Sequence, residues 1–458
     1  MDNIINNLKL LSVKELFKRL TQIVQQPVFK NIMLVASITL LVKGIGFYKE
    51  SVVAGEFGLS QQLDTFYIAM LIPGFITTVF LGSFNNVFIP NYISEMRTGN
   101  NMSSFQTTGF LVVLGISTVF LIIAFLGTDT YLKNFFAGHT EEYYDYIKVQ
   151  FYVIAPCIII WGLSSFISGL LNINNEFKYS SFNSIFTPIV TIICVFFYKD
   201  YFGNMVLAAG ILIGAILNFL YLFYIAHKRK IISFGKPDFK NENAILMFKQ
   251  VPAKASSGFL TGLLGVTDQY FAAQLAIGSI SALNYGLKIP AFITGLLVMA
   301  MNAVLLPYFS KKVNINKEKA FNELFKMLKW LFIGSCVVTI LVILTSDFMV
   351  HLFFERKEFT SEDTRVVSIL QKIRLIYIPF TLCGMVLVNF LTSINKNSFM
   401  AWIAFASVIL NIILDYVGMK LWGLYGISVA TTLIYIFRSV ILLRFTINQR
   451  KQLSDSKL

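Results

Sequence analysis

This chain of 458 residues contains few of the residues that build disulfide frameworks, metal sites or soluble surfaces. It has four cysteines and three histidines, without a Cys-x-x-Cys pair or a histidine cluster, which argues against a disulfide framework and against a metal site. Only 14% of the residues are charged, whereas 56% are hydrophobic and the mean hydropathy is +0.69. So little charge excludes an ordinary soluble globular protein.

The sequence also lacks the signatures of common enzymes. It has no Walker loop, no dinucleotide-binding fingerprint, no HExxH motif and no nucleophile elbow. We therefore expect no enzymatic activity, no catalytic residue and no cofactor, with a coupling proton or monovalent cation as the one small ligand left open. The net charge of +14 is interpreted as a signal of membrane orientation, so no nucleic-acid partner is expected.

Apolar runs of about 20 residues, the length that crosses a bilayer as a helix, occupy most of the chain. They predict an all-α polytopic membrane protein with about 12 transmembrane helices. The expected spans are 30–50, 65–90, 106–128, 147–172, 179–198, 204–226, 246–275, 279–307, 326–346, 370–394, 399–418 and 423–445. Before them, residues 1–29 mix apolar and basic side chains, a pattern typical of an amphipathic helix lying on the inner membrane surface.

The charges of the loops predict an orientation. Basic residues concentrate in the amino-terminal segment and in three later stretches, 227–245, 308–326 and the tail after Arg444. Acidic residues concentrate in the intervening loops, 129–146 and 347–368. Because basic loops stay inside, we expect a multi-pass protein of the cytoplasmic (inner) membrane with both termini, including the tail 447–458, in the cytoplasm.

An internal repeat relates the first half of the chain to the second. Four matches carry it, in the same order and at a nearly constant separation along the chain: Pro73-Gly74-Phe75-Ile76-Thr77 with Pro290-Ala291-Phe292-Ile293-Thr294, Pro90 with Pro307, Asp129 with Asp347, and Ile173-Asn174 with Ile394-Asn395. The series predicts two six-helix bundles, 30–226 and 246–446, joined by a basic cytoplasmic linker, 227–245. We expect a pseudo-twofold axis along the membrane normal, with the substrate path between the bundles.

Charged side chains inside apolar spans are costly and therefore indicate function. On the first span, Lys43 and Glu50 lie about 20° apart around a helix, and Lys49 is adjacent. We interpret three groups of residues as lining one cavity: Lys43, Lys49 and Lys288 as cations that bind a diphosphate, Glu50, Asp64 and Asp268 as coupling or charge-balancing acids, and Asn85, Asn284, Asn302 and Thr261 as glycan-contacting or cavity-lining groups.

Each of these groups has a structural alternative. Lys49, Glu50 and Asp64 fit the outer interface, where long side chains reach water cheaply. Lys43 and Lys288 fit a buried ion pair with an acid, and Asn85 and Asn302 fit hydrogen bonds between helices. Lys372 and Arg374, at the outer start of the tenth expected span, are interpreted as interface anchors.

Several motifs resemble those of the MviN/MurJ lipid II flippases, within the superfamily of multidrug, oligosaccharidyl-lipid and polysaccharide exporters. The resemblance spans nearly the whole chain. It is carried by Lys43-Gly44-Ile45-Gly46-Phe47-Tyr48-Lys49-Glu50, Gly58, Asp64-Thr65-Phe66, Phe88-Ile89-Pro90, Ser279-Ile280-Ser281-Ala282-Leu283-Asn284-Tyr285 and Leu305-Leu306-Pro307.

The resemblance implies a flippase that carries an undecaprenyl-diphosphate-linked glycan from the inner to the outer leaflet by alternating access. A surface-polysaccharide repeat unit and peptidoglycan lipid II are both implied substrates, with membrane lipid and polysaccharide or peptidoglycan assembly enzymes as partners. The family's functional positions fall on Lys43, Lys49, Glu50, Asp64, Asp268 and Lys288.

The chain departs from the family pattern at several places. The second-helix arginine pair falls on Ile76 and Thr77, the acid beside Lys288 is replaced by Leu287, and the family's two last helices have no counterpart after Arg444. Two other functions stay open: an ion-coupled multidrug or cation antiporter of the same superfamily, and a non-transporting scaffold of a polysaccharide assembly complex.

Overall fold

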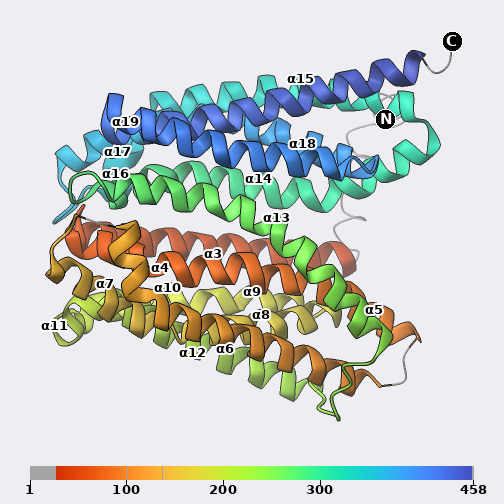
Figure 1. Cartoon of the computed structure of the whole chain (residues 1–458), viewed down its shortest axis with the longest axis horizontal. Coiled ribbons are helices and arrows are strands. Elements are labelled where there is room, and N and C mark those ends of the chain that lie inside the picture. Colours follow the sequence, from red (N-terminus) through yellow and green to blue (C-terminus); the bar gives the residue numbers. More distant parts are fainter. Residues whose placement is uncertain (1–26, 99–100, 137, 456–458) are drawn as a thin grey trace, which may run out of the picture.

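The computed structural model describes residues 27–98, 101–136 and 138–455. The regular structure in these ranges is helical, apart from an isolated β-bridge between Arg356 and Phe359. The amphipathic segment expected over 1–29 lies almost entirely outside the described residues. The described chain forms two groups of helices, α3 to α12 and α13 to α19, which lie in the lower and upper parts of Figure 1, except that the start of α13 reaches down to α5.

The first group follows the expected spans closely, with interruptions inside three of them. Its elements are α3 (Pro27–Phe57), α4 (Gln61–Ile76), the π-helix η1 (Thr77–Leu81), α5 (Gly82–Thr98), α6 (Met102–Phe135), α7 (Glu141–Ile154), α8 (Cys157–Ile173), α9 (Phe177–Phe182), the 3-10 helix η2 (Asn183–Ile185), α10 (Phe186–Phe197), α11 (Lys199–Phe202), the 3-10 helix η3 (Gly203–Met205) and α12 (Val206–Lys228).

The second group consists of longer, less interrupted helices. Its elements are α13 (Glu242–Ala272), α14 (Ser279–Ile315), α15 (Lys317–Leu344), α16 (Ser346–Phe354), α17 (Ser361–Leu375), α18 (Ile378–Ser393) and α19 (Asn397–Asp455). Helix α19 is broken at Gly423, whose φ of 57° lies in the left-handed region that favours glycine. The expected spans 399–418 and 423–445 fall on its two parts.

The helices are long and apolar enough for a membrane protein. Within the described residues, nine stretches satisfy length and composition criteria for crossing a membrane, with α19 counted as a single stretch. Helices α3 and α13, each of 31 residues, carry the expected spans 30–50 and 246–275 in addition. The fold is therefore that of an all-helical, multi-pass membrane protein.

Corresponding residues of the two groups make the same local contacts. The Thr77 hydroxyl donates to the carbonyl of Pro73 at 2.8 Å, and Thr294 donates to Pro290 at the same distance. The matched acids Asp129 and Asp347 also pair with lysines of the following helices, at 2.5 Å with Lys148 of α7 and at 2.6 Å with Lys372 of α17, although the two lysines occupy different positions in the repeat. These contacts support the repeat inferred from the sequence.

One register of the repeat requires correction. Asn175 and Asn395 both adopt a left-handed conformation, with φ of 61° and 59°, directly after α8 and α18. Gly203 and Gly423 are a second such pair, with φ of 50° and 57° and the same separation along the chain. Asn395 is therefore the counterpart of Asn175 and not of Asn174. The predicted match was shifted by one position because it aligned identical letters rather than equivalent turn positions.

The packing differs between the two ends of the molecule. At the end where α3 terminates, called the Phe57 end and seen on the left in Figure 1, one hydrophobic cluster joins both groups of helices. Towards the opposite end there are separate clusters, one in the first group together with the start of α13 and one entirely in the second group. The two groups are therefore packed together most continuously at the Phe57 end.

Candidate functional site

A cavity of about 530 Å³ lies between α3, α14 and the segment α9–α10, and we call it the central cavity. Its lining includes four residues that the sequence analysis selected: Lys43, Lys49, Glu50 and Lys288. The other lining residues are Thr39, Val42, Gly46, Phe47, Ser181, Ser184, Pro188, Ala291 and Phe292. Helices α3 and α14 belong to different groups, so the cavity is shared by both.

The charges of the central cavity are arranged around one acid. The Lys49 ammonium group donates to Glu50 Oε1 at 2.5 Å, and Lys288 Nζ lies 3.0 Å from Glu50 Oε2. Lys288 Nζ also lies 5.6 Å from the centre of the Tyr67 ring, a cation–π contact. Lys43 is exposed on the same lining and has no acidic partner within the described residues. Three cations and one anion leave the cavity with a net charge of +2.

Aromatic packing holds α3 in this position. The Phe47 ring lies 4.9 Å from Phe353 and 5.8 Å from Phe292, in edge-on geometry with both. Because Lys43 and Glu50 lie about one helical turn before and after Phe47, the same helix face carries them to the cavity. The sequence prediction placed these three residues on one side of the helix, as the cavity lining has them.

Asp64 has a different position from the one expected. Its buried carboxylate accepts hydrogen bonds from the backbone N–H of Gly278 and of Ser281, both at 2.7 Å, and from the Ser281 hydroxyl at 2.5 Å. It therefore satisfies the orphan donors at the start of α14, where a negative charge is favourable. Asp64 does not line the central cavity, and it links the first group of helices to the second.

At the Phe57 end, the connection between α16 and α17 contacts the first group, and the connection between α6 and α7 contacts the second group. The backbone N–H of Glu358 donates to the carbonyl of Gly55 at 3.0 Å, and Lys357 pairs with Glu56, which also accepts from Lys199 at 3.0 Å. In the opposite direction, His139 Nε2 hydrogen-bonds to the carbonyl of Ala273 at 2.8 Å. We call these two reciprocal contacts the clasp.

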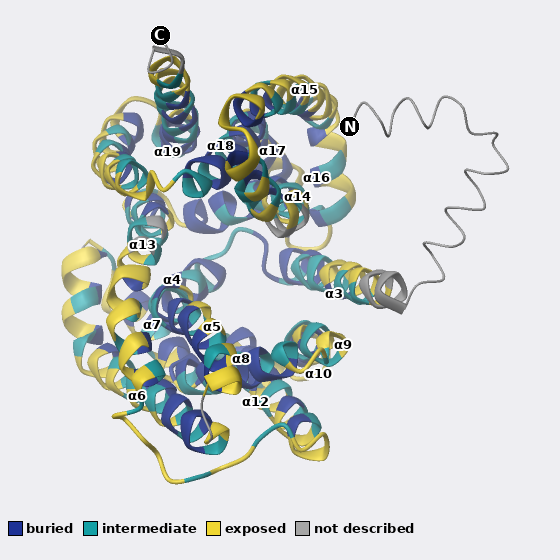
Figure 2. Ribbon diagram, turned by 90° about the vertical axis from the view of Figure 1, so that its right-hand side faces the viewer, coloured by how far each residue is buried: buried dark blue, intermediate teal, exposed yellow. Residues whose placement is uncertain are grey.

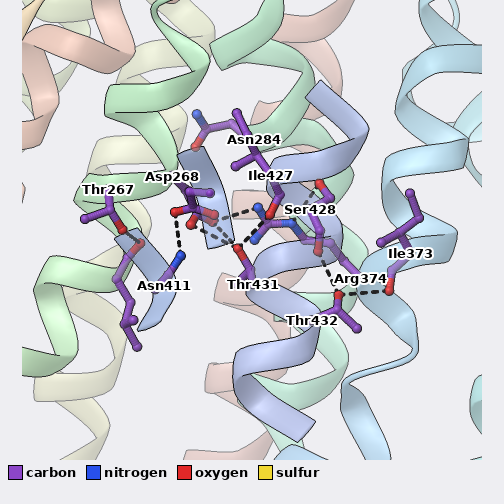
Figure 3. A network of polar contacts seen from close by, with 12 residues as sticks. Thr267, Asp268, Asn284, Ile373, Arg374, Asn411, Ile427, Ser428, Thr431 and Thr432 are labelled. Atoms are coloured by element: carbon purple, nitrogen blue, oxygen red, sulfur yellow. Dashed lines mark hydrogen bonds and ion pairs between the residues drawn. The ribbon is translucent and has the colours of Figure 1, made fainter. Parts of the chain in front are cut away.

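Asp268 lies in a second, smaller chamber inside the second group. This chamber of about 140 Å³ is lined by residues of α13, α14, α17 and α19, with Tyr377 just before α18. Asp268 Oδ2 lies 2.7 Å from Arg374 Nη2, and the Thr431 hydroxyl donates to both carboxylate oxygens at 2.8 and 2.9 Å. Figure 3 shows these groups converging between the helices. Asn284 lines this chamber and not the central cavity.

The interpretation of Arg374 as an interface anchor was wrong. Its side chain is buried, pairs with Asp268 and donates through Nε to the Ser428 hydroxyl at 3.3 Å. The sequence reading placed Arg374 by its distance from the end of an apolar run. The acidic partner, 106 residues earlier in the chain, could not be identified from that distance.

Sequence reasoning also missed two polar residues of α19. Asp415 is buried facing Asp268, and the Asn411 side-chain amide donates to it at 2.5 Å. The signal was present, since an amide and an acid at i and i+4 within an apolar span lie on one helix face. The sequence analysis selected charges of the other spans and not this pair.

The remaining predicted glycan contacts do not line the central cavity in the described part of the structure. The Asn85 amide donates to the Ser165 hydroxyl and joins α5 to α8. Thr261 and Asn302 belong to α13 and α14, but their side chains lie outside the described residues. The hydroxyl groups that do line the cavity, on Thr39, Ser181 and Ser184, were not predicted.

Comparisons with known proteins agree on one family. The model of the family described as "Lipid II flippase MurJ" matches residues 53–458. A probable lipid II flippase MurJ of Buchnera aphidicola subsp. Schizaphis graminum is 26% identical over 381 residues, covering 80% of this chain and 72% of that protein. The corresponding protein of Rickettsia prowazekii is 23% identical over 448 residues, covering 92% and 84%.

Solved structures show the same fold. The chain resembles a lipid II flippase MurJ in an inward closed conformation with a TM-score of 0.79 and 23% identity, covering 91% of this chain and 87% of that one. It resembles an inward-facing multidrug resistance MATE family transporter with a TM-score of 0.75 and 12% identity, covering 93% and 99%. An outward-facing MATE family transporter gives a TM-score of 0.64 at 13% identity, covering 93% and 95%.

Proposed function

This chain belongs to the lipid II flippase MurJ family, a family of transporters rather than enzymes, and we propose that it carries a polyprenyl-diphosphate-linked glycan from the inner to the outer leaflet of the cytoplasmic membrane. The relatives named as lipid II flippases favour the peptidoglycan precursor as the glycan. A surface-polysaccharide repeat unit has the same diphosphate and is the second substrate to test.

The observation that carries this proposal is the charge of the central cavity. Lys43, Lys49 and Lys288 surround a single acid, Glu50, and give a net charge of +2. A diphosphate that joins a lipid to a sugar carries two negative charges, so it matches this balance. Such a group cannot enter hydrocarbon without compensation, and ammonium groups in a site with little water attract it strongly.

The cation and drug antiporters of the superfamily form the rival class. A cavity that binds cations needs an excess of acids, whereas here cations outnumber the acid three to one. The likeness to MATE transporters, at 12% and 13% identity, concerns the fold. The central cavity therefore favours an anionic substrate.

The packing of the two groups supports alternating access. The repeat and the predicted loop orientation favour twelve spans in two six-helix bundles, related by a pseudo-twofold axis, with the Phe57 end facing outwards. In this conformation the clasp and a shared hydrophobic cluster hold that end together. We propose that rocking of the bundles opens this end after the substrate binds from the inside.

The lipid tail needs a path at the side of the protein. Helices α5 and α13 pack closely together on one flank, whereas the backbones of α3 and α14 scarcely approach each other among the described residues. Figure 2 shows α3 at the edge of the molecule beside α9 and α10, and its contacts with the second group include α16. We propose that the tail stays in the lipid at this flank while the diphosphate occupies the cavity.

Asp268 is the acid best suited to coupling. Asp415 faces it, and among the described residues the guanidinium of Arg374 pairs with Asp268 alone. Two buried acids beside one base leave room for one proton or one monovalent cation, since an uncompensated buried charge is unfavourable. Glu50, held by two lysines, and Asp64, held by the start of α14, are proposed to balance charge rather than to couple.

The test is a transport assay with the purified protein in vesicles. Lys43→Ala with Lys288→Ala should abolish flipping of a fluorescent polyprenyl-diphosphate-linked sugar. Lys148→Ala removes a lysine that pairs with Asp129 away from the cavity, so it should leave flipping within about twofold of the unmodified protein. Unchanged flipping by the double variant would contradict the assignment of the cavity.

A further inference from the structure

We infer that Ser181 and Ser184 form the part of the central cavity that receives the first sugar of the substrate. This inference rests on the proposed function and adds to it a recognition site for carbohydrate. Ser181 lies in α9 and Ser184 in the following 3-10 helix η2, and both line the cavity that contains Lys43 and Lys288.

The backbone directs these hydroxyl groups to the cavity. Helix α9 packs against α3, and the 3-10 turn that follows changes the direction of the side chains before Pro188 in the first turn of α10. Ser184 is exposed, and its hydroxyl donates to Asn183 Oδ1 at 2.8 Å, so the oxygen remains able to accept from a ligand. Ser181 has no hydrogen-bond partner among the described residues.

The residues that correspond to Ser181 and Ser184 in the second half of the chain show whether packing requires their hydroxyl groups. The register is the same before this segment, where Asn175 matches Asn395, and after it, where Gly203 matches Gly423. In that register the counterparts of Ser181 and Ser184 are Ala401 and Ala404. A small side chain is enough for the fold at both positions, so the hydroxyl groups of the first bundle are additional features of the cavity.

The chemistry of these groups fits a sugar ring better than a phosphate or a lipid. Two hydroxyl groups add no charge, but they can donate to and accept from the hydroxyl and amide groups of a carbohydrate. In a lipid-linked glycan the first sugar is bonded directly to the diphosphate, so its binding site must lie beside the lysines. A single cavity of about 530 Å³ contains both sets of groups.

The experiment compares two probes on the purified full-length protein. One is a short-chain polyprenyl diphosphate that carries an N-acetylated hexose, and the other is the same polyprenyl diphosphate without the sugar. For Ser181→Ala with Ser184→Ala, binding of the sugar-bearing probe should weaken about tenfold, since two hydrogen bonds are lost. Binding of the bare diphosphate should stay within about twofold.

A neighbouring serine provides the matched control. The Ser180 hydroxyl donates to Asn172 Oδ1, lies 3.0 Å from the carbonyl of Phe177 and does not line the cavity, so Ser180→Ala should not discriminate between the two probes. If the double serine variant weakened both probes equally, or neither, the sugar site would be refuted. Lys43→Ala with Lys288→Ala should weaken both probes, and if it weakened neither, the proposed function itself would fail independently of the serines.

Discussion

Glu50 and Asp268 lie on the first helices of the two groups, α3 and α13, but their surroundings differ. Glu50 lies in the larger, more open central cavity with three lysines, whereas Asp268 lies in a smaller chamber with Arg374 and faces a second buried acid, Asp415. Lys288 keeps 25% of its side chain exposed, and Arg374 only 3%. The partly exposed Lys288 can therefore bind a ligand, whereas within the described part of the chain the buried Arg374 pairs only with Asp268.

The difference predicts opposite responses to neutralisation. A buried ion pair that loses one partner leaves an unpaired charge without water, which costs about 3 to 5 kcal/mol. A charge in an open cavity is solvated after its partner is removed, so the cost is below about 1 kcal/mol. Stability should therefore depend on the chamber, and substrate affinity on the cavity.

The largest expected effect is that of Asp268→Asn. It leaves the Arg374 guanidinium without its carboxylate and should destabilise the protein by about 3 to 5 kcal/mol, measured as thermal or denaturant stability in detergent. Adding Arg374→Gln should recover at least half of the loss, because neither member of the pair then remains charged. Lys288→Met, the matched change in the cavity, should cost under about 1 kcal/mol of stability. Equal losses of stability in the two variants would contradict the view that the chamber charges stabilise the fold and the cavity charges do not.

The sequence predicted the cavity better than the chamber for a physical reason. Lys43 and Glu50 are near neighbours on one helix, so helical periodicity was sufficient to bring them together. Lys288 joined them because a lysine well inside an apolar span is unusual. Asp268 and Arg374 meet because α13 and α17 both pack on α19, which no periodicity within one helix encodes.

The fold was predictable to a similar degree. Apolar length located the helices, and proline and aspartate matches located the repeat. The interruptions were not predicted, because η2 and the break at Gly423 depend on local backbone conformations. The clasp was not predicted either, since it joins loops to helix ends across the two halves.

The second largest effect is expected at the clasp, where a glycine packs against the backbone of the other group. Gly58 has a φ of 52°, and a Cβ there would overlap the carbonyl oxygen of Glu358. Gly58→Ala should therefore disfavour the closed Phe57 end by about 1 to 3 kcal/mol. Distance measurements between spin labels on residues 141 and 362, which are exposed in the first turns of α7 and α17 and lie outside the clasp, should show a larger open population. Gly203→Ala is the control, because Gly203 has a similar φ but no neighbour within 4 Å of its Cβ position. If both variants opened the Phe57 end equally, the opening would result from backbone strain and not from the overlap with Glu358.

A smaller effect on stability, but a measurable one on binding, is expected for Glu50→Gln. Removing the single acid raises the cavity charge from +2 to +3 and releases Lys49 and Lys288 from their shared partner. Affinity for a polyprenyl diphosphate should rise severalfold at low salt, and the gain should shrink as salt screens the interaction. Asp64→Asn changes an acid that does not line the cavity and should not show this gain. A fall in affinity for Glu50→Gln would indicate that Glu50 positions the lysines more than it competes with the substrate.

The smallest effect is expected where the two halves are most alike. The matched acids Asp129 and Asp347 each pair with a lysine of the following helix, Lys148 and Lys372, and both acids are 64% exposed. Lys148→Ala and Lys372→Ala should each cost about 0.2 to 1 kcal/mol, because water and salt replace most of the attraction. The two losses should be equal and should leave flipping unchanged. If only one of the two lysine variants lost transport, that ion pair would have a function that its counterpart lacks. If both variants transported normally, function would lie in residues that differ between the two halves, such as those of the central cavity.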